Sequence, residues 1–189
     1  MVKIVAQEQD PPNGTDELEI HFPLVSLRIF EQWNLRSLRR LKISCISALE
    51  TLSGLRICEF LQELVCPFNR LVSLDELWGH ACLEILDVES NLIADQGNWM
   101  VIHSMTNLKQ LEIGGNSICS HPQYCDIEFL SSAFPLIETF NGIELRPQSR
   151  ITTATSSTRI SEPEQLYPKN IKTSSARVKA FPVIANKLR

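Results

Sequence analysis

Apolar residues recur in one fixed pattern along the middle of the chain. Three eleven-residue segments, LQELVCPFNRL, LEILDVESNLI and LKQLEIGGNSI, begin at Leu61, Leu83 and Leu108 and share the pattern L-x-x-L-x-[apolar]-x-x-N-x-[LI]. Because successive side chains in a strand point to opposite faces, the L-x-[apolar] part predicts a short strand with one buried face. Strands this short need neighbours, so the pattern predicts stacked repeats that share one hydrophobic core.

An asparagine follows each of these predicted strands, at Asn69, Asn91 and Asn116. Its amide can both donate and accept hydrogen bonds where the chain turns, so we expect it to satisfy backbone groups that the turn buries. Weaker copies of the pattern begin near Thr15 and Leu38 and lack the asparagine. The chain is therefore predicted to contain about five stacked repeats.

The segments between the predicted strands carry apolar residues at helical spacing. We expect short, tight helical turns in most of them and a fuller helix from about Gln96 to Met105. Residues 1–14 are predicted to form a hairpin-like lead-in that covers the open edge of the first repeat. Near the other end, Pro122 suits the first turn of a helix, and Phe134-Pro135 ends it.

Residues 119–146 are similar to the C-terminal cap of leucine-rich repeat proteins of the short, roughly 22-residue class. The typical N-P pair, tyrosine and F-P-x-L-x-x-L-D-G motif correspond to His121-Pro122, Tyr124 and FPLIETFNG, which begins at Phe134. Two positions depart from the family pattern, because His121 replaces an asparagine and Asn141 replaces an aspartate. The sequence thus resembles this family over residues 15–146.

The resemblance implies an α/β fold: a right-handed leucine-rich repeat solenoid with a short-stranded parallel concave sheet, a helical convex side and a C-terminal cap. The family includes a protein phosphatase regulatory subunit, a spliceosomal ribonucleoprotein subunit, a tubulin-folding cofactor and an axonemal dynein light chain. Their shared property implies a non-catalytic protein-protein interaction scaffold, an adaptor or regulatory subunit. The partner protein and the pathway, whether cytoskeletal, phosphatase-linked or splicing, stay open.

Charge divides the chain into two parts of different character. Residues 1–146 carry 10 basic and 20 acidic side chains, whereas residues 147–189 carry 8 basic and 2 acidic ones and are rich in Ser, Thr and Pro. This composition predicts a disordered basic tail. An alternative function is a ribonucleoprotein-associated subunit that contacts nucleic acid through this tail and the basic residues Arg39, Arg40 and Lys42. The acidic repeats argue against nucleic acid spreading over their surface.

The sequence contains no apolar run of membrane-spanning length and no signal-peptide layout at its start. We therefore expect a reducing, cytoplasmic setting, with the cilium or axoneme and the nucleus as open alternatives, and free cysteines such as Cys66 in the core. Cys119, His121 and Cys125 form the one group of ligand-type residues, but their spacing is not that of a zinc site. We expect no metal, no cofactor and no enzymatic activity.

The outward positions of the strands should form the binding surface on the concave face. Apolar residues at such positions are the usual centre of a protein interface, with polar residues around them. We predict that the partner binds at Phe22, Arg40, Lys42, Val65, Phe68 and Ile85. A slip of one residue in register would move these side chains to the opposite face.

Overall fold

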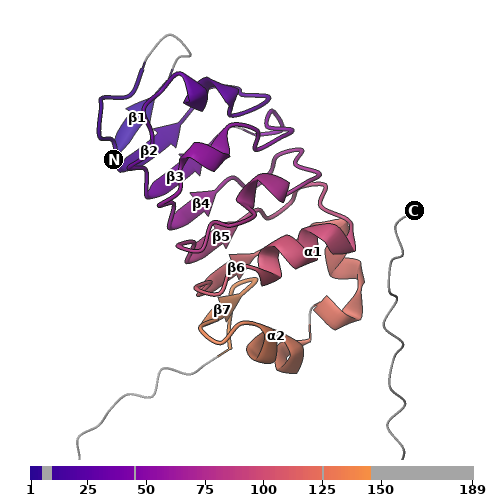
Figure 1. Ribbon diagram of the computed structural model, residues 1–189. Coiled ribbons are helices and arrows are strands. Elements are labelled where there is room, and N and C mark those ends of the chain that lie inside the picture. Colours follow the sequence, from indigo (N-terminus) through magenta and orange to yellow (C-terminus); the bar gives the residue numbers. More distant parts are fainter. Residues whose placement is uncertain (6–9, 45, 125, 146–189) are drawn as a thin grey trace, which may run out of the picture. The chain divides into compact units, whose positions relative to one another are not determined.

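The computed structural model describes residues 1–5, 10–44, 46–124 and 126–145, so the predicted tail lies outside the described residues. Within them the strands form one eight-stranded sheet in sequence order; each strand from β1 to β7 pairs in parallel with the next, and β8 runs antiparallel to β7 (Figure 1). The strands are β1 Val2–Ile4, β2 Glu17–Ile20, β3 Arg40–Ile43, β4 Glu63–Val65, β5 Ile85–Asp87, β6 Gln110–Glu112, β7 Thr139–Phe140 and β8 Ile143–Glu144.

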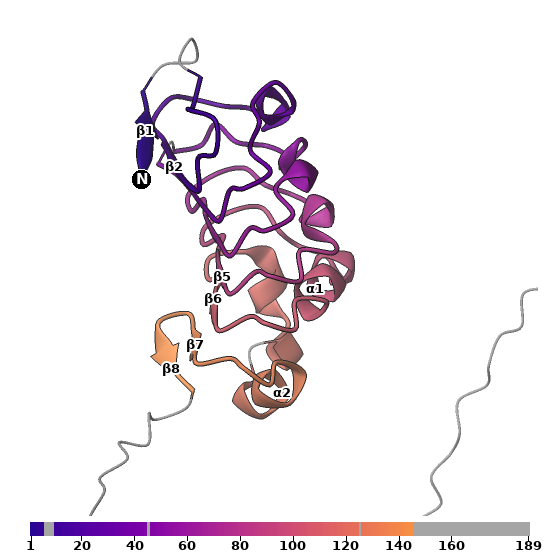
Figure 2. The ribbon, with the colours of Figure 1, turned by 60° about the vertical axis from the view of Figure 1, so that its left-hand side comes forward.

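Helical segments connect consecutive strands from β2 to β7 and lie on the opposite side from the strands (Figure 2). They are the 3-10 turns η1 Arg28–Glu31, η2 Leu55–Ile57, η3 Asp75–Leu77, η4 Ser117–Ser120 and η5 Pro122–Tyr124 and the α-helices α1 Gln96–His103 and α2 Ile127–Ala133. The predicted alternation of short strands with tight helical turns is therefore confirmed. Among the described residues, no helix has the length and apolar character needed to cross a membrane.

One column of leucines runs through the sheet and forms the centre of the core. The strand register places Leu18, Leu41, Leu64, Leu86 and Leu111 side by side on consecutive strands. Each of these side chains is at most 1% exposed. The stacked strands, the shared leucine core and the helical return segments together make the chain an α/β leucine-rich repeat solenoid, as the repeated pattern predicts. The right-handed sense and the family identity of the C-terminal cap stay predictions.

The asparagines after the strands form a buried hydrogen-bonded ladder. Asn91 Oδ1 accepts from the backbone N–H of Leu71 at 3.0 Å, and its Nδ2 donates to the carbonyls of Val88 at 3.0 Å and Cys66 at 3.2 Å. The equivalent asparagines of the preceding and following repeats likewise accept from one repeat and donate within their own. Each amide thus joins two repeats and satisfies groups that have no access to water, which confirms the predicted structural role.

The N-terminal lead-in differs from the prediction. Val2–Ile4 pairs in parallel with β2, so it extends the solenoid by one strand and does not form a hairpin. A hairpin joins two antiparallel strands through a tight turn, whereas the chain between Ile4 and Glu17 is long enough for the crossover that a parallel pair requires. Pro11-Pro12-Asn13-Gly14 forms a turn before β2, since Thr15 N–H donates to Pro12 O at 3.2 Å and Gly14 has φ 77°.

The α-helices α1 and α2 differ in how well the helical spacing of apolar residues predicts their bounds. The fuller helix is confirmed as α1, which Asp95 caps by accepting from Asn98 N–H at 2.9 Å. The helix expected from Pro122 onward begins only at Ile127, after the separate turn η5. Its buried face is narrow, because Ile127 is 51% exposed while Leu130 is fully buried.

Candidate functional site: the strand face

The outward side chains of β2 to β7 form the surface that the sequence predicts as the binding face; we call it the strand face. Because neighbouring strands are in register, these side chains stand in two columns that cross the sheet. The first column is Glu17, Arg40, Glu63, Ile85, Gln110 and Thr139, and the second is Glu19, Lys42, Val65, Asp87 and Glu112.

The charges on β1 to β3 are paired with one another. Arg40 Nη1 lies 2.6 Å from Glu17 Oε1, and the same carboxylate receives the N-terminal amine at 3.3 Å. In the second column, Glu19 lies between two lysines, with Lys3 Nζ at 3.1 Å and Lys42 Nζ at 3.7 Å. The predicted contacts Arg40 and Lys42 are thus exposed, but their charges are already partly compensated within the sheet.

Glu19 occupies an unusual place for a carboxylate, since the residue is only 4% exposed. The hydrogen bond from Lys3 is the main cause that holds the pKa of this carboxyl at about 2, with burial acting in the opposite direction and a hydrogen bond from Ser44 assisting Lys3. A buried charge requires such partners, because its removal from water is otherwise too costly. The N-terminal part of the strand face therefore carries a preformed ionic network.

Apolar side chains replace charged ones in the centre of the strand face. Val65 and Ile85 are half-buried and lie diagonally across β4 and β5, since the register pairs Val65 with Asp87 and Glu63 with Ile85. Phe68 follows β4 and is 49% exposed. These three predicted contacts thus come from two neighbouring repeats and offer apolar surface to solvent.

Phe68 has a backbone conformation that is costly for its side chain. Its φ is 56°, in the left-handed region, and the corresponding positions of the next two repeats hold Ser90 with φ 52° and Gly115 with φ 73°. A bulky residue at positive φ is an outlier that costs on the order of 1–3 kcal/mol, and such residues cluster at functional sites. The turn requires positive φ, and only this one of the three repeats places a large ring there.

Carboxylates surround the apolar centre. Glu63 and Asp87 flank Val65 and Ile85 in the columns, Glu112 follows on β6, and Glu89 lies just beyond the end of β5. Burial raises the pKa of Asp87, although the backbone N–H of Glu89 donates to its Oδ1 at 3.1 Å and acts in the opposite direction. Asp87 is thus a carboxylate that is partly removed from water and has no ion-pair partner within the described part of the chain.

Phe22 is a wrong assignment. It is only 6% exposed and belongs to the hydrophobic core, so it does not face solvent on the strand face. Phe22 lies two residues after Ile20 and four after Leu18, which are both buried. The period of two therefore places Phe22 on the buried face, and its prediction as an outward residue disregarded this spacing. The carboxylates of Glu63 and Asp87 are the opposite case. They occupy outward strand positions beside Ile85 and Val65 but are not among the predicted contacts, and a count of charges along the two columns would have found them.

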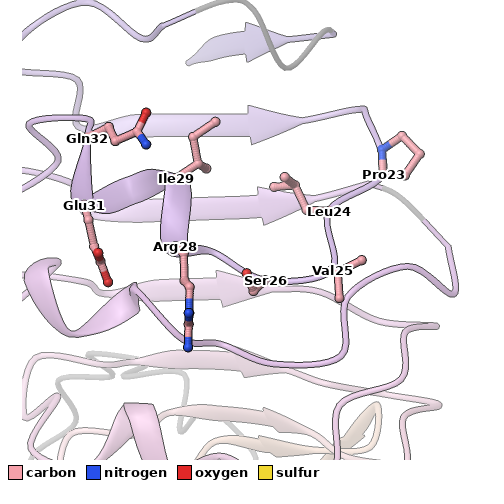
Figure 3. A pocket seen from close by; sticks show the side chains of 8 residues that line it. All are labelled: Pro23, Leu24, Val25, Ser26, Arg28, Ile29, Glu31 and Gln32. Carbon is pink, nitrogen blue, oxygen red and sulfur yellow. The ribbon is translucent and has the colours of Figure 1, made fainter.

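Other candidate chemistry is dispersed. A surface hollow of about 520 Å³ is lined by η1 and the loop before it, and Arg28 and Glu31 project from η1 to one side of it, opposite to Ile29 and Gln32 (Figure 3). Its lining contains neither histidine nor cysteine. Cys58 and Cys66 are buried, and burial raises the pKa of the Cys58 thiol to about 12, so this sulfur is a poor nucleophile.

Of the ligand-type residues Cys119, His121 and Cys125, only the first two lie within the described residues. Cys125 lies outside the described residues, and the imidazole of His121 packs against the ring of Tyr124 with centroids 5.8 Å apart. Over the part of the chain that the structure describes, no three His, Cys, Asp or Glu side chains come together in a way that could hold a metal ion.

Comparisons with known proteins found likeness among solved structures. No protein-family model matches the sequence, and no curated protein is similar to it. Among solved structures, the crystal structure of the Drosophila melanogaster SNF/U2A′ complex is similar to 76% of this chain and the match covers 73% of that chain, with 15% identity and a TM-score of 0.42.

Proposed function

We propose that this protein is a non-catalytic interaction scaffold, an adaptor or regulatory subunit, and that it binds a protein partner on the strand face. The observation that carries this proposal is the apolar group of the exposed Phe68 and the half-buried Val65 and Ile85 on adjacent repeats. Protein interfaces have a central apolar contact surrounded by polar side chains, and this group is surrounded in that way. Arg40 and Lys42 lie on β3, the strand beside β4, and belong to the polar rim.

The rigidity of the surface supports the same function. Each strand is fixed by its neighbours, and buried asparagines also tie together the repeats around β4, β5 and β6, so the side chains of the strand face are held in place before a partner arrives. A preformed surface loses little conformational entropy on binding. A scaffold requires no catalytic residue. We place this one in the cytoplasm, because a reducing environment keeps thiols such as the buried Cys58 and Cys66 reduced.

Aspartate substitutions test the proposal in affinity capture from a lysate. Val65→Asp and Phe68→Asp should each reduce the captured partner at least tenfold, because a charge in the apolar centre of an interface costs more than about 1.4 kcal/mol. Aspartate is well suited to the positive φ of residue 68, so Phe68→Asp leaves the local backbone relaxed.

The control is Met100→Asp, which changes a side chain of similar exposure on α1, on the helical side. This variant should capture the partner as wild type does. If the two strand-face variants fold, as judged by their urea unfolding midpoints, and retain the same partners as wild type, the partner binds elsewhere.

The ribonucleoprotein alternative has weaker support in the described residues. Its basic contacts would include Arg40 and Lys42, and both lie beside the carboxylates of β2. Its other element, the basic tail, lies outside the described residues. Binding of a single-stranded RNA that is unaffected by Val65→Asp and that weakens steeply with salt would favour this alternative.

A further inference from the structure

The two halves of the strand face differ in charge. On β1 to β3 every carboxylate of the two columns has a cationic partner: Lys3 and Lys42 flank Glu19, and Arg40 contacts Glu17. The carboxylates of this half are therefore compensated within the sheet, so it carries no net negative charge that could attract a basic partner.

The half formed by β4 to β6 carries negatively charged side chains that have no ion-pair partner among the described residues. Within residues 1–5, 10–44, 46–124 and 126–145, Glu63, Asp87, Glu89 and Glu112 take part in no ion pair. Their polar contacts come from neutral groups: Asp87 Oδ1 accepts from Glu89 N–H at 3.1 Å, and Glu112 Oε1 accepts from Gln110 Nε2 at 3.3 Å and from Gly142 N–H at 3.2 Å. Neutral donors orient these carboxylates and leave their negative charge in place.

The uncompensated charge coincides with the apolar centre. In the register of β4 and β5, Val65 stands beside Asp87, and Ile85 stands beside Glu63, so apolar and acidic side chains alternate in both directions. Phe68 adds an exposed ring at the end of β4. A ligand that fits this pattern must present apolar groups and positive charges at intervals of a few ångströms, which a polypeptide with mixed lysine or arginine and apolar residues can do.

We propose that the strand face of β4 to β6 binds a basic segment of a partner protein that carries apolar side chains between its lysines or arginines. This inference rests on the proposed scaffold function and names the chemistry of its partner. The apolar side chains contact Val65, Phe68 and Ile85, and the basic ones contact the four carboxylates. Nucleic acid is disfavoured at this site, because its phosphates would meet the same negative charges.

A synthetic peptide tests the proposal with the full chain. The probe is a fluorescein-labelled peptide of about 14 residues with about four lysines interspersed with two or three leucines, and its two matched forms replace lysine by glutamate or leucine by serine. Fluorescence anisotropy should show binding of the lysine–leucine form, with an affinity that falls at least tenfold between about 50 and about 300 mM salt. Both matched forms should bind at least tenfold more weakly.

Substitutions in the protein locate the site. The double variant Glu63→Gln/Glu112→Gln should bind the lysine–leucine peptide about tenfold more weakly, and Ile85→Ser should do the same. The control double variant Glu31→Gln/Glu59→Gln removes the same charge from the helical side and should bind as wild type does. Urea unfolding midpoints confirm that each variant is folded.

The outcomes separate this inference from the proposed function. Equal binding of the glutamate form, or unchanged binding by Glu63→Gln/Glu112→Gln, overturns the basic partner, while Val65→Asp still reports on the scaffold. Tighter binding of a single-stranded RNA of about 12 nucleotides at the same residues would also overturn it. The remaining candidate for the occupant of the strand face is the basic segment 147–189 of the same chain. If replacing Lys169, Lys172, Lys179 and Lys187 by glutamine strengthens peptide binding tenfold, that segment and not a partner occupies the face.

Discussion

At the scale of single residues, Asn91 shows how one side chain can hold two repeats together. Its amide makes four hydrogen bonds with backbone groups, which are the N–H of Leu71 and the carbonyls of Cys66, Val88 and Glu89. No hydrophobic side chain could replace it, because these backbone groups are cut off from water and need polar partners.

We expect Asn91→Ala to lower the free energy of unfolding by about 3 kcal/mol, since buried backbone groups lose their partners. Urea unfolding followed by circular dichroism measures the loss. The control is Asn107→Ala, which removes one exposed hydrogen bond to Ala81 O and should change stability by less than about 0.5 kcal/mol. Equal effects of the two substitutions would contradict the structural role of the ladder.

Glu19 links the stability of the N-terminal repeats to pH. Its pKa is about 2 in the folded protein and 4.5 ordinarily, so the unfolded chain binds more protons between these values. The stabilisation is therefore fully present above about pH 4.5 and is lost as the pH falls toward about 2. The free energy difference between wild type and Glu19→Gln should be constant above about pH 5 and should shrink below it.

The comparison requires urea unfolding of both proteins at closely spaced pH values. Lys3→Met provides the matched test, because removal of the main hydrogen-bond donor should raise the pKa of Glu19 and move the loss of stability to higher pH. A difference between wild type and Glu19→Gln that stays constant down to pH 3 would show that Glu19 is not held by this network.

The sequence predicts residues of this kind unevenly. The ladder asparagines follow from a repeated pattern, because each of them does the same task in each repeat. Glu19 does not, since its environment is made by Lys3, Lys42 and Ser44, which come from two other segments of the chain. Local spacing contains no information about such neighbours.

At the scale of elements, the helical return segments pack close to one another, and Gly54 marks the tightest contact. A Cβ at this position would lie 2.2 Å from the carbonyl oxygen of Leu27, and φ is 104°. The turns η1 and η2 therefore approach through backbone and not through side chains. Glycine is needed both for the conformation and for the space.

Gly54→Ala should lower the free energy of unfolding by about 3 kcal/mol or more, because steric overlap adds to the cost of positive φ. Gly79→Ala separates the two causes, since Gly79 has φ 90° but no atom within 4 Å of the added Cβ. We expect about 1 kcal/mol for this second variant, measured by thermal or urea unfolding. If both variants lose the same stability, the close approach to Leu27 contributes nothing.

Elements were predicted well where a regular period defines them. The strands and the helix α1 follow from apolar spacing and were placed within a few residues. The lead-in and α2 were placed less well: Val2–Ile4 joins the sheet in parallel, and the last helix begins at Ile127 after Asp126 accepts from the N–H of Glu128 at 2.8 Å. In both cases the conformation of a terminal segment depends on the surface that it covers, and a short apolar run does not indicate what that surface is.

At the scale of the whole sheet, the strand face joins an internally paired half to a half with uncompensated negative charge. The pairs Lys3–Glu19 and Glu17–Arg40 neutralise the first strands. Asp87 and Glu112 keep their charge on later strands, beside the apolar side chains of β4 and β5. Charged groups steer association and select partners, while the apolar centre contributes most of the affinity. This division gives the proposed scaffold an apolar surface for a partner to contact and a negative charge that selects a positively charged partner.

The sequence by itself determined the solenoid, the leucine column and the asparagine ladder. These features repeat every twenty-odd residues, and a repeat needs only its own period and a copy of itself as neighbour. Only the tertiary structure decided that Glu19 is buried, that Arg40 and Lys42 are paired and that, among the described residues, Glu63 and Asp87 have no ion-pair partner. The physical reason is that burial and ion pairing depend on which side chains from distant segments meet across the sheet, and a one-dimensional period does not specify them.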